Sequence, residues 1–161
     1  MKGSRARVTL RDVAPADVPI LYSYQSDPVA NRLAGFIPKK RAPFYAQWKK
    51  ILKDPSVEKK LILLDGAPAG YLVCFVRVRP DREVGYWISR DHWGKGVATK
   101  ALRLFLKEYA FRPLYARVAQ HNAASLKVVR RNGFKIIGED KFSNSAGENY
   151  DEFVLQLKST P

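Results

Sequence analysis

Residue types that build many functional sites are scarce in this chain of 161 residues. Its single cysteine, Cys74, excludes an internal disulfide. Because Cys74 lies in the apolar run Tyr71–Val76, we expect a buried packing role rather than a nucleophile. The two histidines, His92 and His121, are far apart in sequence and leave no recognisable metal-ligand spacing. We therefore expect neither a disulfide framework nor a metal site.

Long hydrophobic runs are also missing. No apolar run approaches the roughly 20 residues that a membrane-spanning helix needs. The segment Met1–Arg5 leads straight into a strand pattern and lacks the apolar region of a signal peptide. Hydrophobic residues still make up 46% of the chain, which is ordinary for a globular protein. These features predict one cytoplasmic domain over residues 1–161 without membrane association, and they leave monomer or homodimer open.

Acidic residues are few. The 29 Lys and Arg against 15 Asp and Glu give a net charge of 29 − 15 = +14. Such an excess can attract a large polyanion, for example RNA or a ribosomal surface. The basic residues are nevertheless scattered along the sequence rather than gathered into one stripe, which favours a solvated basic surface without a partner. Both interpretations stay open at this point.

The hydrophobic pattern predicts a mixed α/β domain. Helices are expected from Asp12 or Pro15 to near Ser26-Asp27-Pro28, over Arg41–Lys53, over 96–110 and over 122–132, and Val29–Lys40 is expected to be a loop. Strands are expected at Arg7–Arg11, Lys60–Leu64, Ala69–Val78, Glu83–Ile88, Leu114–Val118, Phe134–Phe142 and Tyr150–Leu157. The strand Ala69–Val78 is apolar on both faces, which indicates helices on both sides of the sheet.

The most informative segment is Trp93-Gly94-Lys95-Gly96-Val97-Ala98-Thr99-Lys100-Ala101-Leu102. It follows the strand Glu83–Ile88 and opens a helix. The first N–H groups of a helix have no intrahelical partner, and the helix dipole adds partial positive charge there. Glycine also lets the backbone come close to a ligand. The segment therefore predicts a site for phosphate oxygens.

The spacing of this segment resembles the pyrophosphate-binding signature of the GNAT N-acetyltransferases. The surrounding residues strengthen the resemblance: the strand end Gly85-Tyr86-Trp87-Ile88, the run Asn122-Ala123-Ala124-Ser125, and Asn132-Gly133-Phe134. The N-terminal run Val8-Thr9-Leu10-Arg11, with Asp17-Val18 and Asp27-Pro28, is similar to the RimJ/RimL-like branch of ribosomal-protein N-terminal acetyltransferases. The resemblance extends from about Arg7 to Leu157.

The resemblance implies a fold and a donor. The expected fold is a central, mostly antiparallel mixed sheet of six to seven strands with about four helices, whose fourth and fifth strands splay apart. The expected cosubstrate is acetyl-CoA. Pantetheine is expected on Trp87, Ile88 and Ser89, with Asn122 as a further contact, and the pyrophosphate on Gly94, Lys95, Gly96, Val97, Ala98 and Thr99. A backbone N–H near Ile88 is expected to stabilise the oxyanion, and Lys127, Arg130 and Arg131 are candidates for the 3′-phosphate.

The resemblance also suggests an acid for the departing thiolate. Many relatives place a tyrosine seven residues after the asparagine, but this chain has Val129 there. In the ribosomal-protein branch a serine three residues after the asparagine serves instead, and Ser125 occupies that place. Ser125 is therefore predicted to be the catalytic acid, with solvent as the alternative. Asn122 is also well placed to cap the helix that follows it.

A base that takes a proton from the acceptor amine is harder to assign. Glu83, on the strand that enters the site, is the leading candidate, although a carboxylate at a strand start is commonly just solvated. Acids of the last hairpin, Glu148, Asp151 and Glu152, are alternatives. Histidine is a residue type suited to this role, but both histidines are expected on loop surfaces.

These residues predict acetyl-CoA-dependent N-acetylation by direct attack of an amine in a ternary complex. An α-amine has a pKa about 2.5 units below that of lysine, a difference of roughly 3.4 kcal/mol, so it needs less help from a base. The preferred acceptor is thus the α-amine of a protein or peptide, with Asn31, Arg32 and Phe36 of the 29–40 loop shaping selectivity. Two alternatives remain: a small-amine acetyltransferase acting on an antibiotic, polyamine or amino-acid derivative, and a CoA-binding, RNA- or ribosome-associated module with little catalysis.

Overall fold

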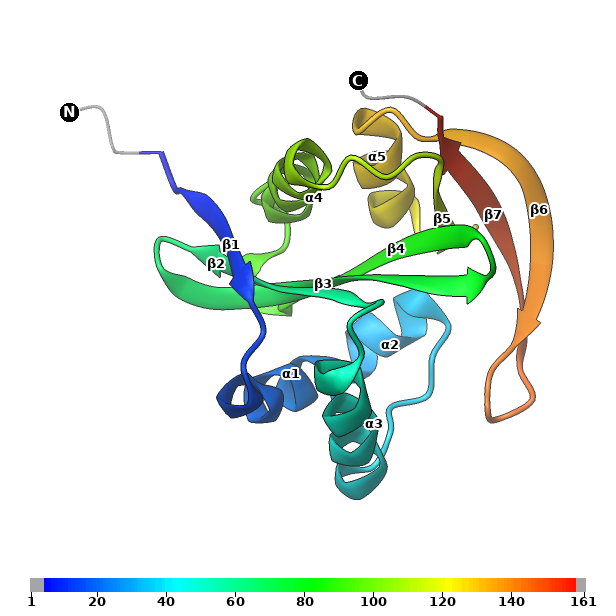
Figure 1. Cartoon of the computed structure of the whole chain (residues 1–161). Coiled ribbons are helices and arrows are strands. Elements are labelled where there is room, and N and C mark those ends of the chain that lie inside the picture. The colour runs from blue at the N-terminus through cyan, green and yellow to red at the C-terminus, as the bar shows by residue number, and fades with distance from the viewer. Residues whose placement is uncertain (1–4, 159–161) are drawn as a thin grey trace.

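The computed structural model describes residues 5–158 and has one seven-stranded sheet with helices on both faces (Figure 1). The sheet order is β1-β2-β3-β4-β5-β7-β6, and among these described strands only β4 and β5 pair in parallel. The strands are β1 (Val8–Asp12), β2 (Glu58–Leu64), β3 (Ala67–Val78), β4 (Asp81–Ile88), β5 (Leu114–Ala119), β6 (Lys135–Ser143) and β7 (Asn149–Leu157). The mixed α/β fold predicted from the sequence is therefore confirmed.

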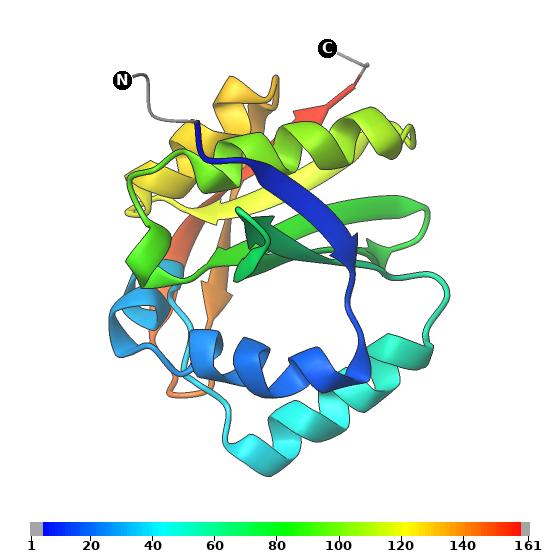
Figure 2. The ribbon, with the colours of Figure 1, turned by 90° about the vertical axis from the view of Figure 1, so that its left-hand side faces the viewer.

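The helices form two layers (Figure 2). The first three lie on one face of the sheet and the last two on the other, as Figure 1 also shows. They are α1 (Val18–Gln25), α2 (Pro28–Ala34), α3 (Arg41–Lys53), α4 (Val97–Glu108) and α5 (Ala123–Arg131), with short 3-10 turns at Pro15–Asp17 and Arg90–His92. Within residues 5–158, none of these helices has the length and apolarity that crossing a bilayer requires.

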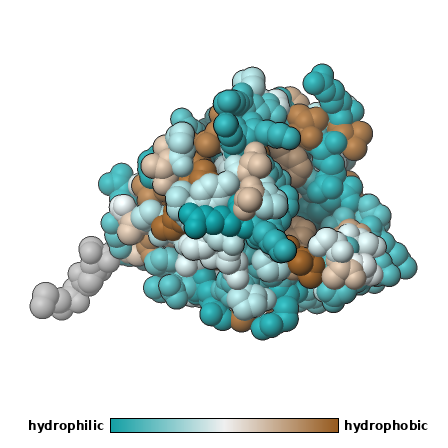
Figure 3. All heavy atoms as spheres, turned by 90° about the horizontal axis from the view of Figure 1, so that it is seen from below, coloured by the Kyte–Doolittle hydropathy of each residue, from teal (hydrophilic) through white to brown (hydrophobic). Residues whose placement is uncertain are grey.

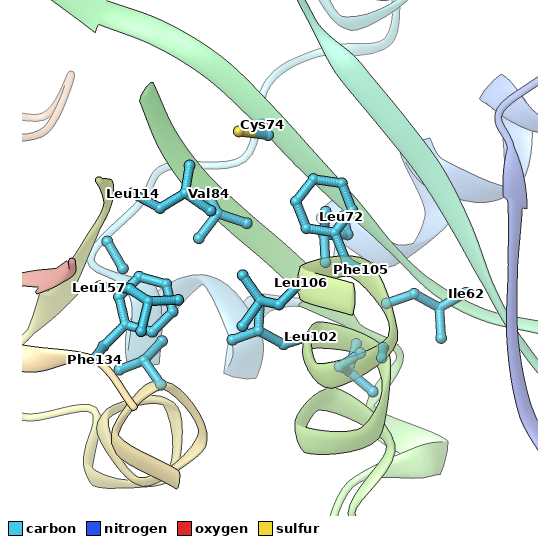
Figure 4. Packing of buried hydrophobic residues seen from close by; sticks show 14 of the residues in the cluster. Ile62, Leu72, Cys74, Val84, Leu102, Phe105, Leu106, Leu114, Phe134 and Leu157 are labelled. Carbon is cyan, nitrogen blue, oxygen red and sulfur yellow. The ribbon is translucent and has the colours of Figure 1, made fainter. Parts of the chain in front are cut away.

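Strand β3 belongs to both hydrophobic cores, as its apolar character predicts. Leu72 and Cys74 pack in the core under α4 and α5, whereas Tyr71 packs in the core over α1 and α3. Figure 4 shows Leu102, Phe105 and Leu106 of α4 among the strand residues of the first core. Cys74 is completely buried, and this burial raises the pKa of its thiol to about 11. The predicted packing role of Cys74 is confirmed.

The prediction that 29–40 forms a loop is wrong for its first part, because α2 occupies Pro28–Ala34. The Asp27 side chain caps this helix by accepting a hydrogen bond from the Val29 N–H at 2.9 Å. Pro28 takes the first helical position, where its missing N–H costs nothing, and Gly35 ends the helix at φ 76°. The same Asp-Pro pair that suggested the end of one helix thus begins the next. The chain consequently has five α-helices in its described part, one more than expected.

The segment Asn132-Gly133-Phe134, at the end of α5, connects α5 with α4. The Asn132 Nδ2 group donates hydrogen bonds to the Val128 carbonyl at 3.0 Å and to the Thr99 carbonyl at 3.2 Å. Gly133 adopts φ 91°, and Phe134 is buried in the core. The end of α5 therefore holds the first turn of α4 in place, and this turn is the start of the predicted phosphate site.

Candidate active site

The two central strands of the sheet, β4 and β5, pair over only two positions. Arg82 pairs with Leu114 and Glu83 with Tyr115, after which the strands diverge. A first cavity of about 420 Å³ opens against α4 and α5, and a second of about 380 Å³ opens towards β5 and β7. Both cavities are lined by Ala34, Tyr86, Trp87, Asn122 and Ser125. The splay expected from the family resemblance is present, and the two cavities meet at it.

The first cavity contains the glycine-rich turn before α4. The Trp93 indole closes this turn by donating a hydrogen bond from Nε1 to the Ile88 carbonyl at 2.9 Å. Gly94 and Gly96 adopt φ 75° and 72°, a conformation that costs other L-residues about 1–2 kcal/mol. Gly96 is also the N-cap of α4, and no side chain accepts from the first N–H groups of this helix. These N–H groups are therefore free to bind an anion.

The space over the turn is open. A Cβ atom built on Gly94 or Gly96 would meet no atom of the described residues within 4 Å. Lys127 and Arg131 of α5 line the same cavity and add positive charge, whereas Arg130 does not line it. Free N–H donors, an unobstructed approach and two nearby cations fit a polyphosphate ligand.

Most of the residues predicted to bind the cofactor line the first cavity. Those that do are Trp87, Ile88, Gly94, Gly96, Val97, Ala98, Thr99 and Asn122. Ser89 and Lys95 lie outside this lining, and the Ser89 N–H already donates to the Ala69 carbonyl at 2.8 Å. The structure thus gathers eight of the ten residues around one cavity, and their contacts with a cofactor stay predictions.

Ser125 lies in the first turn of α5, where both cavities meet. The Asn122 Oδ1 atom caps α5 by accepting a hydrogen bond from the Ser125 N–H at 3.2 Å, so the predicted capping role is confirmed. The Ser125 Oγ atom lies 2.7 Å from the Tyr86 hydroxyl of β4, and either hydroxyl can donate. When Ser125 Oγ is the donor of this pair, the Tyr86 hydroxyl donates its one proton to the Ser125 carbonyl at 3.2 Å.

Tyr86 is a candidate functional residue that the sequence analysis missed. Burial raises its pKa to about 12, so the phenol keeps its proton at neutral pH. Val129, where many relatives have a tyrosine, is buried on α5 four residues after Ser125, on the same side of the helix. Tyr86 of β4 therefore places a phenol beside the face of α5 that carries Val129 instead of a tyrosine. Period-two alternation with Val84 and Ile88 places Tyr86 on the α4–α5 side and was the only signal for it in the sequence.

The second cavity holds a group of paired charges. Glu83, at its floor, accepts a hydrogen bond from the Arg77 Nε group at 2.5 Å and lies 3.7 Å from the Arg117 Nε atom. Arg117 also donates to Glu152 Oε1 at 2.8 Å and to Asp140 Oδ2 at 2.9 Å. The hydrogen bond to Glu152 raises the pKa of Arg117 above its ordinary value. Both candidate bases that line this cavity, Glu83 and Glu152, are therefore already bound to arginine.

The other candidates for the base do not line the second cavity. Glu148 is exposed in the β6–β7 turn, where its carboxylate accepts hydrogen bonds from Asn144 and Tyr150, and Asp151 is exposed. His121 is exposed as expected. His92 is not on a loop surface: it is half-buried in a 3-10 turn and lines the first cavity, because the chain must turn sharply after β4.

The three predicted selectivity residues divide into different environments. Phe36 is 51% exposed and stacks on Trp87, with ring centroids 6.4 Å apart, at the wall of the second cavity. Arg32 is exposed on α2. Asn31 is buried, and its Nδ2 group donates to the Gln25 and Asp27 carbonyls at 2.6 Å and 2.8 Å, so it holds α2 against α1.

Comparisons with known proteins agree with this geometry. A family model described as an acetyltransferase (GNAT) domain matches residues 7–135. The ribosomal-protein-serine acetyltransferase of Escherichia coli (strain K12) is 30% identical over 94 residues, which are 54% of this chain and only 52% of that protein.

Two solved structures share the fold. RimL, a ribosomal L7/L12 alpha-N-protein acetyltransferase in complex with coenzyme A, has a TM-score of 0.79 at 20% identity and covers 94% of each chain. A GNAT phosphinothricin acetyltransferase from Sinorhizobium meliloti in complex with acetyl-CoA has a TM-score of 0.79 at 21% identity, over 95% of this chain and 89% of that one. The relatives thus act on different acceptors, but the family is clear: this chain belongs to the GNAT acetyltransferases.

Proposed function

We propose that this protein transfers an acetyl group from acetyl-CoA to the α-amine of a peptide or protein. The observation that carries the proposal is the uncapped start of α4 at Gly96, which opens onto a cavity that meets a second one at Ser125 and Tyr86. Acetyl-CoA supplies an activated thioester whose pyrophosphate suits the free N–H groups. Two joined cavities let a donor and an acceptor bind together, as direct transfer requires.

The reaction needs one bond formed, one bond broken, one proton lost by the amine and one proton gained by the thiolate. The nitrogen of the neutral acceptor amine bonds to the acetyl carbon, and the carbon–sulfur bond breaks. The amine proton leaves to water, and the departing thiolate takes a proton from Ser125 Oγ. Tyr86, 2.7 Å away, then returns a proton to Ser125 and is itself reprotonated from solvent. The two hydroxyls therefore act as one proton-donating pair.

The charge of the second cavity supports an acceptor with one amine. Its charged lining residues are Arg77, Glu83, Arg117 and Glu152, two of each sign. A polyamine or aminoglycoside carries several positive charges, and a cavity without net negative charge does not compensate for their desolvation. An α-amine brings a single charge and loses it near pH 8. The peptide chain that follows can extend past the exposed Phe36.

The acceptor class is tested by release of the CoA thiol with a panel of amines. We expect turnover with peptides that have a free N-terminus, rising with pH as the α-amine, of pKa about 8, loses its proton. The control is the same peptides blocked by N-acetylation but carrying an internal lysine, which should be inactive. Faster turnover of spermidine, an aminoglycoside or phosphinothricin would instead establish a small-amine enzyme. Acetyl-CoA binding without turnover of any amine would contradict catalysis altogether.

Donor binding at the glycine turn is tested with Gly96→Ala. The new Cβ fills the open space over the turn, so we expect the dissociation constant of acetyl-CoA to rise about tenfold, or roughly 1.4 kcal/mol. Gly66→Ala is the matched control, because Gly66 adopts φ 82° in the β2–β3 turn with equally open space. Both variants should lose about 1–2 kcal/mol of stability, but Gly66→Ala should bind acetyl-CoA normally by calorimetry. Equal affinities in the two variants would remove the turn from the donor site.

The proton-donating pair is tested with Ser125→Ala and Tyr86→Phe. We expect Ser125→Ala to lower kcat on the order of 100-fold, the effect of losing a positioned general acid, and Tyr86→Phe to lower it less. The affinity for acetyl-CoA should stay unchanged in both, which separates a chemical role from a binding role. Tyr24→Phe, which removes a phenol from α1 outside both cavities, is the control. An unchanged kcat in Ser125→Ala would leave proton donation to solvent.

The role of Glu83 follows from its partners. Taking a proton from the acceptor would neutralise the carboxylate and disrupt its pairing with Arg77 and Arg117. An α-amine can lose its proton to water at a pH near neutrality. Glu83 is therefore better suited to position the two arginines in the acceptor cavity than to act as the base predicted from the sequence.

Glu83→Gln tests these two roles through the pH profile. As a positioning variant it should raise the KM of the peptide, leave kcat within about threefold and keep the ascending limb at the α-amine pKa. Asp140→Asn, which removes another carboxylate from Arg117 outside the cavity, is the control. A roughly 100-fold loss of kcat at pH 7 that recovers at high pH, where the amine is already neutral, would establish Glu83 as the base.

A further inference from the structure

One continuous part of the chain carries positive charge without any negative charge. Between Asp27 and Asp54 there is no Asp or Glu. The same stretch contains seven basic residues, Arg32, Lys39, Lys40, Arg41, Lys49, Lys50 and Lys53, which equal half of the net charge of +14. The basic residues are therefore less scattered than the sequence as a whole suggests.

The fold presents these charges to solvent. All seven side chains are exposed, and within residues 5–158 none of them lies within 4.0 Å of a carboxylate oxygen. Phe44 and Trp48 bury the opposite side of α3 against α1 and the sheet. Figure 3, which views the molecule from the α1–α3 side, shows mostly hydrophilic side chains on this face. We call the cations from Lys39 to Lys53 the basic face of α3.

The helix dipole does not explain this arrangement, although two of the cations have contacts of their own on α3, Lys39 with Gln47 and Arg41 with Tyr45. Lys39, Lys40 and Arg41 stand at the N-terminus of α3, where the helix dipole is positive and a cation is unfavourable by several tenths of a kcal/mol. Lys40 occupies the N-cap position without a side-chain hydrogen bond, where Ser, Asp or Asn would be preferred. Only Lys50 and Lys53, in the last turn, suit the dipole. Cations at a helix N-terminus, where the dipole disfavours them, indicate a role in binding something other than the helix itself.

The proposed donor does not account for this face either. The glycine turn and the cations Lys127 and Arg131 lie with α4 and α5 on the opposite side of the sheet (Figure 1). The two groups of cations at the ends of α3 stand at opposite ends of a helix about 20 Å long. A small anion can reach only one group, whereas a chain of phosphates can reach both.

We propose that the basic face of α3 binds the phosphate backbone of RNA. The other exposed residues of α3 are Ala42, Pro43, Ala46 and Gln47, and its large apolar side chains are all buried or half-buried. Protein interfaces are centred on aromatic and large apolar anchors, whereas backbone binding to nucleic acid requires mainly cations. The face therefore suits an RNA backbone better than an acidic protein.

The position of this face connects it with the acceptor side. The chain runs from Phe36, which lines the second cavity but not the first, to Lys39 within three residues. RNA held on α3 would thus lie beside the acceptor cavity rather than the donor side. A protein bound to that RNA would have its N-terminus held at a high effective concentration near the site.

The test compares two triple variants of equal charge loss. One carries Lys49→Gln, Lys50→Gln and Lys53→Gln on α3, and the other carries Lys100→Gln, Arg103→Gln and Lys107→Gln on the exposed side of α4. The probe is a fluorescein-labelled 24-nucleotide oligouridylate, measured by anisotropy from 50 to 300 mM KCl. We expect the α3 variant to bind at least about tenfold more weakly and to lower the salt slope by about 2, since each lost phosphate contact removes about 0.7.

The test also has a control for correct folding and results that would overturn the proposal. The α3 variant should turn over a short acceptor peptide like the wild-type protein, which shows that it is folded and separates this proposal from the proposed function. RNA binding that survives in the α3 variant, or that falls equally in the α4 variant, would overturn the proposal. So would an acidic polyglutamate peptide that displaces the RNA at equal charge concentration, because the face would then recognise acidic protein.

Discussion

The parallel contact between β4 and β5 is the constraint on which the rest of the site depends. These strands pair over only two positions and separate beyond them, while β5 pairs with β7 along its whole length on its other edge. The separation opens the centre of the sheet to both helical layers. It exposes the end of β4 and the first turn of α5 at one point. Every residue proposed to take part in the chemistry lies at this opening or at its edge.

The two sides of the opening differ in which groups carry charge and in whether those charges are paired. On the side of α4, the backbone itself is the positive group, because Gly96 leaves the first helical N–H groups without a side-chain cap. On the side of β7, arginine and glutamate side chains neutralise one another around the second cavity. A protein with a charge of +14 thus keeps its proposed acceptor cavity free of net charge. Within residues 5–158, the cations of the basic face of α3 have no carboxylate oxygen within 4.0 Å.

The sequence predicted the donor side well because its signals are local. Glycines at positive φ and the uncapped helix start arise from residues close together in the chain, so the segment 93–102 displays them directly. The capping role of Asn122 is local in the same way. The wrong prediction of a loop at 29–40 came from interpreting Asp27 and Pro28 as a helix end. An Asp-Pro pair is compatible with a helix end and with a helix start. The hydrogen bond that the Asp27 side chain accepts from the Val29 N–H shows that a helix starts here.

The family, the residues around the glycine turn and every strand and helix except α2 could be predicted from the sequence. Which side chains from distant segments meet could be seen only in the folded chain. Tyr86 approaches Ser125 from 39 residues away, and Glu83 finds Arg117 across the one parallel strand pair. Sequence periodicity does not show such pairings. A strand pattern indicates on which face of the sheet a side chain lies, but not which residue it contacts there. The partners are set by sheet order and by the angle at which β4 and β5 diverge, and both are properties of the packed chain.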